Sequence, residues 1–245
     1  MSGGIWAAAS GATTELMSLD ATANNLANAN TPGYKGDSAV FREHLMSAVN
    51  GGRAVKEMRF SAVDAFAHDY SAGPINQTGR PLDAAIQGDG FFVVKTPQGE
   101  RYTRAGSFDL TQKGELTMPG GALVMNEVGR PIVVPPDTKS VRIMADGGID
   151  ADGATVGRVK VVKFPNQGAL DKEGNILFKA TPASGRPKVV PADLQTQSVE
   201  GANTSVVLGM SSMVTTTRTF DAIERVIDAF NQADKLAATD VGSVK

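Results

Sequence analysis

Two glycine-containing stretches come closest to known ligand-binding loops, and each lacks a residue that its chemistry requires. A dinucleotide fingerprint needs three spaced glycines at the entry to a helix, but in "GDGFFV" at 88–93 the third position is Val93 and no helical pattern follows. A calcium loop needs a carboxylate first and a glutamate twelfth. In "GIDADG" at 148–153 those positions are Gly148 and Val159. We therefore interpret both stretches as turns or strand ends.

The other residues that could catalyse or bind show no suitable grouping. The sequence has no cysteine, and nothing in it places a nucleophile beside His44 or His68. Arg158, Lys160 and Lys163 alternate with valines, as on the solvated face of a strand, so we assign them no anion. No spacing marks a carboxylate pair for glycan cleavage. We predict that the protein is not an enzyme and holds no cofactor or metal.

Charge and hydropathy exclude several kinds of partner. The 245 residues carry 24 Lys and Arg against 26 Asp and Glu, so no excess charge attracts a nucleic acid or an anionic membrane. No run of about 18 apolar residues occurs, so we expect no membrane-spanning helix. The first basic residue is Lys35, and the segment before it lacks the pattern of a secretion signal. We expect any export to proceed without a cleavable leader.

Both ends of the chain carry residues at the spacing of a coiled-coil helix, with alternating steps of four and three. The N-terminal seam is Ile5, Ala9, Ala12, Leu16, Leu19, Ala23 and Leu26. The C-terminal seam is Met213, Thr216, Phe220, Ile223, Ile227, Phe230, Asp234 and Ala237. Thr216 and Asp234 are polar interruptions of that seam. Small side chains at one end and bulky ones at the other suit holes and knobs, so we expect the two helices to pair.

The N-terminal helix is not expected to be stable by itself. Burial of Ile5, Leu16, Leu19 and Leu26 yields about 6 to 12 kcal/mol, whereas ordering roughly 22 backbone residues costs about 20 to 40 kcal/mol. Backbone hydrogen bonds return only part of the difference, and residues such as Asn24 are weak helix formers. We therefore expect the chain ends to become ordered when other surfaces cover them, as elements of an assembly.

The stretch "NNLANANTPGYK" at 24–35 marks the end of the N-terminal helix. Pro32 disfavours a helical Thr31, and Gly33 can take the left-handed conformation of a turn. The stretch has four asparagines and no charge before Lys35. Such residues suit a crowded surface, where amides can hydrogen-bond to close neighbours.

The middle of the chain predicts an all-β domain over residues 75–195. Short β-branched or aromatic segments alternate with glycine-containing turns, as in consecutive hairpins. The predicted strands are 90–95, 100–104, 107–110, 130–134, 140–144 and 157–164. The predicted fold class is α+β, with paired N- and C-terminal coiled-coil helices flanking this all-β middle domain.

The remaining boundaries follow from these elements: an N-terminal assembly helix and turn over 1–35, a connector over 36–74 and a C-terminal assembly helix within 196–245. In the connector, Phe41, Leu45 and Ala48 have helical spacing, which predicts a short helix. Farther along, Met58, Phe60 and Ala62 alternate, which predicts an extended arm.

Four stretches of the sequence resemble the flagellar axial proteins, the rod and hook subunits of the bacterial basal body. They are "NNLANANTPGYK", "GRPLDAAIQGDGFFVV" at 79–94, "YTRAGSFDLTQKGEL" at 102–116 and "EGANTSVVLGMSSMVTTTRTFD" at 200–221. Their order matches a rod protein with helical ends around a β-rich middle. Length and the opening residues favour a proximal rod subunit, with a distal rod subunit as the alternative. Phe220 and Asp221 depart from the Glu- and Met-rich continuation expected in the family.

The resemblance implies a structural subunit of the periplasmic rod that polymerises helically through its terminal helices into a drive shaft for motility. Its partners would be itself, other rod and hook–basal-body subunits, and the flagellar export apparatus. The residues that we expect at subunit contacts are Ile5, Leu16, Leu19, Asn24, Asn25, Leu26, Asn28, Pro32, Gly33, Met213, Phe220, Ile223, Ile227 and Phe230. A secreted β-domain binding protein, dimerised by its helices, is the less favoured alternative.

Overall fold

The computed structural model describes the chain except residues 1, 47–48, 51–52, 55–57 and 243–245. The chain divides into two compact units. The helical unit comprises Met1–Ala27, Asp37–Ala67 and Ser205–Lys245, and the β unit comprises Asn28–Gly36 and His68–Thr204. The predicted fold class is confirmed, because two packed terminal helices flank a β-rich middle region in the sequence.

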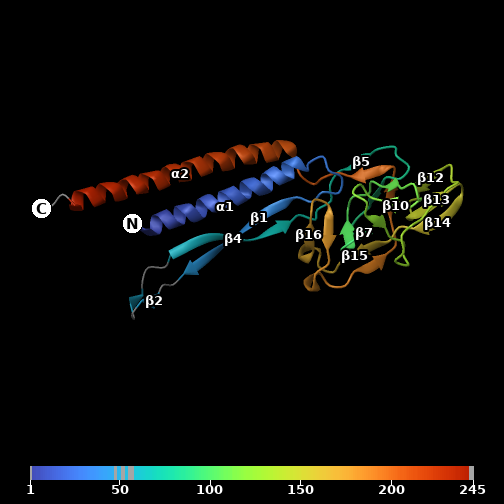
Figure 1. Cartoon of the computed structure of the whole chain (residues 1–245), viewed down its shortest axis with the longest axis horizontal. Helices are drawn as coiled ribbons and strands as arrows, with labels where there is room; N and C mark the ends of the chain where they lie inside the picture. The colour runs from blue at the N-terminus through green and yellow to red at the C-terminus, as the bar shows by residue number, and fades with distance from the viewer. Residues whose placement is uncertain (1, 47–48, 51–52, 55–57, 243–245) are drawn as a thin grey trace. The chain divides into compact units, whose positions relative to one another are not determined.

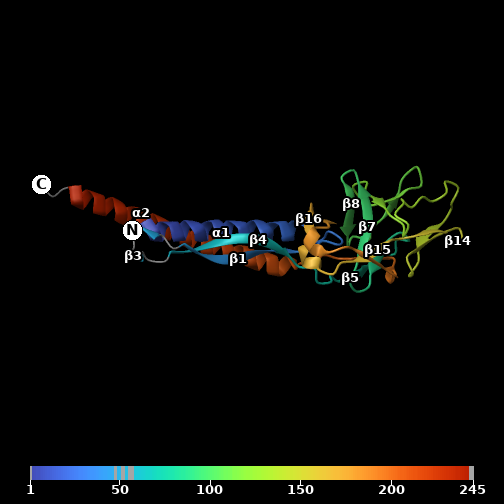
Figure 2. The ribbon, with the colours of Figure 1, turned by 90° about the horizontal axis from the view of Figure 1, so that it is seen from below.

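The helical unit contains two long helices and a two-stranded ribbon. Helix α1 (Ser2–Ala27) and helix α2 (Val206–Gly242) lie side by side and run in opposite directions (Figures 1 and 2). Strand β1 (Asp37–Met46) pairs with β4 (Met58–His68), and α1 also packs against β1. Two very short strands, β2 (Val49–Asn50) and β3 (Arg53–Ala54), pair with each other.

The helix predicted in the connector is wrong, because Phe41 and Leu45 lie within strand β1. A spacing of four residues fits one face of a helix, but four is also a multiple of two and fits one face of a strand. The pairing of β1 with β4 shows that this segment is a strand and not a helix. Ala48 lies outside the described residues. The extended arm predicted around Met58 is confirmed as strand β4.

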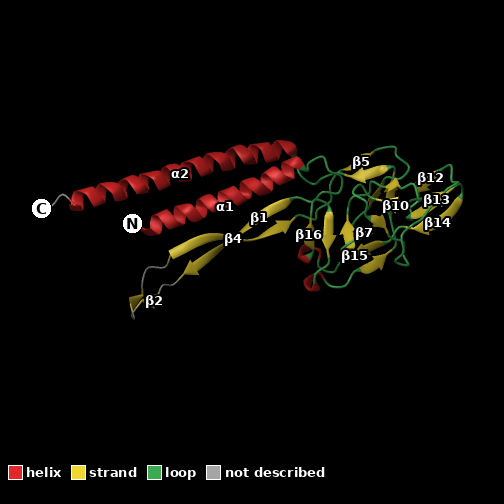
Figure 3. Cartoon of the chain, viewed as in Figure 1, coloured by secondary structure: helices red, strands yellow, loops and turns green. Residues whose placement is uncertain are grey.

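The β unit is built from short strands joined by turns (Figure 3). Its strands are β5 (Ile75–Gln77), β6 (Ala84–Ile86), β7 (Phe91–Thr96), β8 (Gly99–Thr103), β9 (Asp109–Leu110), β10 (Leu116–Thr117), β11 (Leu123–Val124), β12 (Val141–Ile143), β13 (Gly148–Ala151), β14 (Ala154–Arg158), β15 (Val161–Lys163), β16 (Asp171–Glu173), β17 (Leu177–Lys179), β18 (Lys188–Val190), β19 (Leu194–Thr196) and β20 (Ser198–Glu200). Two single-turn 3-10 helices, η1 (Gln167–Ala169) and η2 (Pro182–Ser184), complete it.

The largest sheet of the β unit has the strand order β16-β17-β8-β7-β11-β10-β9, with β15 pairing both β7 and β18. Strands β12, β13 and β14 form a second sheet, and β6 with β19 and β5 with β20 form two-stranded sheets. Every one of these pairings is antiparallel.

Strand β7 forms the centre of the β unit because both of its faces are covered. Phe92 and Val94 point into one apolar cluster, and Phe91 and Val93 point into another. Alternation of side chains along a strand places these pairs on opposite faces. This accounts for the unbroken apolar run that identified the strand in the sequence.

Two of the predicted strands of the β unit are only partly correct. The segment 130–134 makes single β-bridges at Pro131 and Val133 instead of a strand. Proline has no N–H to donate to a ladder, so the sequence cannot sustain one there. The segment 157–164 is divided between the end of β14 and β15, which belong to different sheets.

Candidate assembly surfaces

The two helices of the helical unit pack in a defined register. The Cα of Gly4 faces the ring of Phe230, and Gly11 faces Ile223. Seven residues separate the two glycines and seven separate their partners, so one heptad of α1 matches one heptad of α2 in the opposite direction. Near the other end of α1, Leu26 approaches Gly209, which continues the same antiparallel alignment.

Glycine permits the closest approach in this pair. A Cβ at Gly4 would lie 2.9 Å from Cζ of Phe230, which is closer than real Cβ contacts allow. At Gly11 a Cβ would lie 3.6 Å from Cδ1 of Ile223, an ordinary contact. The aromatic ring therefore uses the space of an absent side chain, as a knob does in a hole.

The seam predicted for α2 matches the less exposed stripe of that helix. Met213, Phe220, Ile223, Ile227 and Phe230 are all half-buried. The two polar interruptions follow the same stripe: Thr216 is 8% exposed and Asp234 is half-buried. The side chain of Ala237 is outside the described set.

The seam predicted for α1 is only partly covered. Ile5, Leu19 and Leu26 are half-buried, whereas Leu16 is 45% exposed and Ala23 is exposed. Helix α1 packs against both α2 and β1, so its covered surface is broader than one seam. The glycines that face α2 lie one residue before the predicted positions 5 and 12.

The two asparagines at the end of α1 have different surroundings. Asn24 is exposed on the helix. Asn25 is half-buried, and its amide holds the first residue of β1: Nδ2 donates to the Asp37 carbonyl at 2.7 Å, and Oδ1 accepts from the Asp37 N–H at 2.8 Å. Asn25 therefore binds the start of the ribbon within the helical unit.

Large apolar side chains are exposed on the outer faces of both helices. On α1, Trp6 is 64% exposed and Met17 is also exposed. On the first turns of α2, Val207, Met210 and Val214 are exposed, at a spacing of three and four residues. This second stripe of α2 begins before the predicted seam and was not predicted from the sequence.

Helix α1 and the first turns of α2 are also nearly free of charge. Between Val206 and Thr217 the sequence has no charged residue, and α1 carries only Glu15 and Asp20. A helix that is apolar or weakly polar all round is normally buried on several sides. The start of α2 thus has the composition of a covered helix while its side chains are exposed in the single chain.

Hydroxyl groups on the exposed helix faces are already hydrogen-bonded within their own helices. Thr13 donates to the carbonyl of Ala9 at 3.0 Å. On α2, Thr215 donates to Ser211 at 3.0 Å, and Thr217 donates to Met213 at 2.8 Å. Covering these faces would therefore leave no hydroxyl donor of these residues unsatisfied, which removes the main cost of burying a polar group.

A shallow groove of about 350 Å³ lies between the helices. Its lining is almost entirely apolar and comprises Ala7, Ala8, Gly11, Thr219, Ala222, Ile223 and Val226. Val226 remains 47% exposed. The groove, Trp6 and the outer stripe of α2 together form what we call the uncharged helix surface.

The turn that follows α1 belongs to the β unit. Asn28 is buried and accepts a hydrogen bond from Asn175 Nδ2 at 2.9 Å. The N–H of Gly33 donates to the carbonyl of Glu200 at 2.7 Å, and Pro32 is half-buried. Two of the predicted site residues, Asn28 and Gly33, therefore bind this turn to the β unit by hydrogen bonds.

Three buried charges lie beneath the turn. Lys35 Nζ is 2.7 Å from Oε1 of Glu200, and Arg104 Nη1 is 3.4 Å from Oε2. The side chains of Lys35, Arg104 and Glu200 are 0%, 3% and 2% exposed. The N–H of Gly73 adds a further donor to Oε1 at 2.9 Å.

Burial is the main influence on the pKa values of the two basic residues in this cluster. Desolvation lowers the pKa of Lys35 and the pKa of Arg104 below their usual values, although the Glu200 carboxylate acts in the opposite direction on both. The Arg104 guanidinium also lies 5.4 Å from the centroid of the Phe91 ring, a cation–π arrangement. The sequence analysis missed Arg104 and Glu200, because no local period links residues so far apart.

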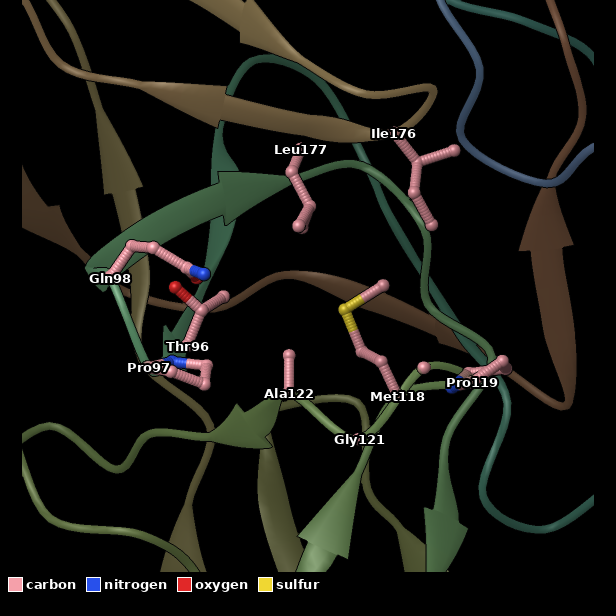
Figure 4. Close-up of a pocket in the computed structure, with 10 residues that line it drawn as sticks. Thr96, Pro97, Gln98, Met118, Pro119, Gly121, Ala122, Ile176 and Leu177 are labelled. Atoms are coloured by element: carbon pink, nitrogen blue, oxygen red, sulfur yellow. The ribbon is translucent and has the colours of Figure 1, made fainter.

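The β unit also contains a pocket of about 310 Å³ (Figure 4). It is lined by Thr96, Pro97, Gln98, Met118, Pro119, Gly120, Gly121, Ala122, Ile176 and Leu177. None of these lining residues has a side chain that titrates near neutral pH, so the pocket holds neither an acid nor a base for catalysis.

The described part of the chain has neither a metal site nor a membrane-spanning helix. No group of His, Asp and Glu there is arranged to hold a metal ion. Among the described residues, no helix combines the length and hydropathy needed to cross a bilayer.

Comparison with protein families gives two matches. The family described as "Flagella basal body rod protein" matches residues 5–35, which include α1 and the turn after it. The family described as "Flagellar hook protein FlgE/F/G D1 domain" matches residues 85–151, within the β unit.

Individual relatives match over almost the whole chain. Flagellar basal-body rod protein FlgF of Escherichia coli is 34% identical over 236 residues, covering 90% of this chain and 91% of its own. Flagellar basal-body rod protein FlgG of Bacillus subtilis is 32% identical over 231 residues, covering 85% and 88%. Flagellar basal-body rod protein FlgF of Caulobacter vibrioides is 28% identical over 226 residues, covering 92% of each.

Proposed function

The chain belongs to the flagellar basal-body rod protein family and is a structural, non-enzymatic subunit of that rod, and from this premise we propose that it forms part of the proximal rod by polymerising through its terminal helices. The observation that carries the proposal is the uncharged helix surface. It exposes apolar side chains, lacks charge and has its threonine hydroxyls satisfied internally.

The chemistry of this surface supports burial against other subunits. Each large apolar side chain that becomes fully covered contributes about 1.5 to 3 kcal/mol. Trp6, Met210 and Val214 are available for this contribution because they are exposed in the single chain. Contacts of one surface with a different surface on the next copy do not close, and they generate a helical filament. Such a filament is the drive shaft that we propose transmits torque.

The contact residues that we propose comprise two groups. The predicted seam residues Ile5, Leu16, Leu19, Leu26, Met213, Phe220, Ile223, Ile227 and Phe230 pair the helices of one chain, and Leu16 remains partly available to a neighbour. Asn24 is exposed near the end of α1, where a neighbouring subunit can contact it. The partners that we propose are further copies, other rod and hook–basal-body subunits and, during export, the flagellar secretion apparatus.

A position in the proximal rod is favoured by the relatives named FlgF, of which one is 34% identical to this chain. A distal rod position is the second candidate, because a relative named FlgG is 32% identical over a similar span. Labelling of this chain in isolated basal bodies distinguishes them: a label near the membrane-proximal end supports the first, and a label near the hook supports the second.

Substitution of Met210 tests the assembly surface directly. Met210→Glu places a charge on an exposed face that contributes little to the fold of the single chain, so the purified protein should remain folded. We expect incorporation into rods, measured by immunoblotting of isolated basal bodies, to fall at least tenfold, because a carboxylate buried in an apolar contact is strongly unfavourable.

Val128→Glu is the matched control. Val128 is 80% exposed and belongs to the β unit, so it is not part of the uncharged helix surface. This variant should incorporate normally. Rods that contain Met210→Glu at the wild-type level would contradict the proposed assembly surface.

A further inference from the structure

Three of the segments that connect the β unit with the rest of the chain are tied to one another by a single side chain. The chain leaves the β unit after Gly36, re-enters it at His68 and leaves it again after Thr204. Asn203 lies at the last of these points. Its amide contacts the backbone at the other two, although those partners are 167 and 134 residues away in the sequence.

The hydrogen bonds at this point form a closed ring. Oδ1 of Asn203 accepts from the N–H of Gly36 at 2.8 Å. Nδ2 of Asn203 donates to the carbonyl of Asp69 at 2.8 Å. The N–H of Asp69 donates to the carbonyl of Gly36, also at 2.8 Å, and completes the ring.

A second layer of bonds joins the same three segments a few residues farther into the β unit. Lys35 Nζ donates to the carbonyl of Ser71 at 2.5 Å and to the carboxylate of Glu200 at 2.7 Å. The N–H of Gly73 donates to the same carboxylate. The N–H of Gly201 donates to the carbonyl of Pro74 at 2.7 Å.

The ring requires the chemistry of an asparagine. One planar amide offers an acceptor and a donor on neighbouring atoms, and the ring uses both. Aspartate keeps the acceptor but has no donor, and alanine has neither. Local turn formation does not account for the arrangement, because the hydrogen bonds of the Asn203 side chain to Gly36, Asp69 and Ser71 all reach segments distant in the sequence.

We propose that Asn203 is the positioning residue of a joint, supported by the Lys35–Glu200 ion pair, that holds the three connecting segments together. Because the segments are bound to one another, a force on one of them is distributed over all three. Such a force is then less able to separate a single segment from the β unit. The inference rests on the proposed function in the rod and adds to it the element of the β unit that resists force applied to its connecting segments.

The test compares Asn203→Ala with wild type as purified full-length chains and in cells that carry the variant as their sole copy. In the purified chain, we expect hydrogen exchange at the Gly36 amide to accelerate about tenfold, the effect of losing one hydrogen bond. Exchange at the buried Val94 amide should not change, which shows that the β unit remains folded. In cells, swimming speed in viscous medium should fall more steeply with viscosity than in wild type.

Asn126→Ala is the matched control, because the Asn126 side chain also hydrogen-bonds to the backbone. Its Oδ1 accepts from the N–H groups of Val128 and Arg130, within a local turn that is not part of the joint. It should leave both the Gly36 exchange and swimming under load unchanged. Asn203→Asp provides a second variant should alanine unfold the unit. It should keep the Gly36 amide protected, because aspartate still accepts from that N–H. Swimming under load should still fall, because aspartate cannot donate to Asp69 or Ser71 as Nδ2 of Asn203 does.

The proposed joint would be contradicted if hydrogen exchange at the Gly36 amide were unchanged in Asn203→Ala. It would also be contradicted if the variant swam under load as fast as wild type. The proposed function fails in a different way. Cells that lack the wild-type chain would then form complete rods and swim, whatever the behaviour of the Asn203 variants.

Discussion

At the scale of single residues, Gly33 shows why the turn after α1 tolerates one amino acid only. Its φ is 72°, in the left-handed region that favours glycine. A Cβ would also lie 2.2 Å from the backbone nitrogen of Ala105, a distance that no flexible side chain can relieve. The sequence indicated a turn at Gly33, but the close approach to Ala105 depends on packing across the β unit.

Gly33→Ala should therefore destabilise the β unit by about 3 kcal/mol or more, since the strained φ and the backbone clash add. Chemical denaturation, monitored by the tyrosine fluorescence of the β unit, measures this change in the free energy of unfolding. Gly174→Ala is the control, because Gly174 has nearly the same φ of 73° but open space around it. Its cost should be about 1 to 2 kcal/mol, and equal losses in the two variants would contradict the packing argument.

Lys35 predicts a pH dependence of stability. Burial lowers its pKa in the folded chain, so between that value and the ordinary value the unfolded chain binds more protons. The free energy of unfolding must then rise with pH across this window. We expect the difference in that free energy between wild type and Lys35→Met to increase as the pH rises toward the ordinary lysine pKa of 10.5. A difference that decreases over this range would show that Glu200 raises the lysine pKa instead.

At the scale of elements, the long heptad period of α2 was a good guide, whereas the short helical spacing of Phe41 and Leu45 was not, because those residues lie in strand β1. The seam from Met213 to Asp234 was predicted correctly in position, including its two polar members, because long helices repeat their environment every seven residues. Gly4 and Gly11 also face α2 but carry no apolar signal, so they were not part of the predicted N-terminal seam. The Lys35–Glu200 pair, 165 residues apart, had no local signal at all.

The register of the helix pair predicts a specific cross-link. The natural chain has no cysteine, so Gly11→Cys combined with Ile223→Cys gives a clean pair for a short bifunctional reagent. We expect efficient cross-linking within one chain in isolated rods, because these residues face each other.

Gly4→Cys with Gly209→Cys is the control for that pair. Gly4 faces Phe230 and Gly209 faces Leu26, so roughly 22 residues of α1, or about 33 Å of helix, separate the two cysteines. This control should not cross-link. Cross-linking of the control instead of the Gly11 and Ile223 pair would contradict the antiparallel register.

At the scale of the whole molecule, stability and assembly are assigned to different parts of the chain. The β unit has apolar clusters on both faces of β7 and a buried ion pair of its own. The helical unit has a narrow covered stripe on α2 and exposes apolar side chains around it. Fold class and family could be predicted from sequence because they depend on long patterns, whereas the joint at Asn203 depends on three segments that meet only in the folded chain.

The most direct test of this account is an electron-microscopy map of the rod from cells that produce this chain, at a resolution that shows side chains. The account predicts that Trp6, Met210 and Val214 are covered by neighbouring subunits in the helical lattice. A map in which the uncharged helix surface faces solvent, with subunits joined through the β unit alone, would contradict it.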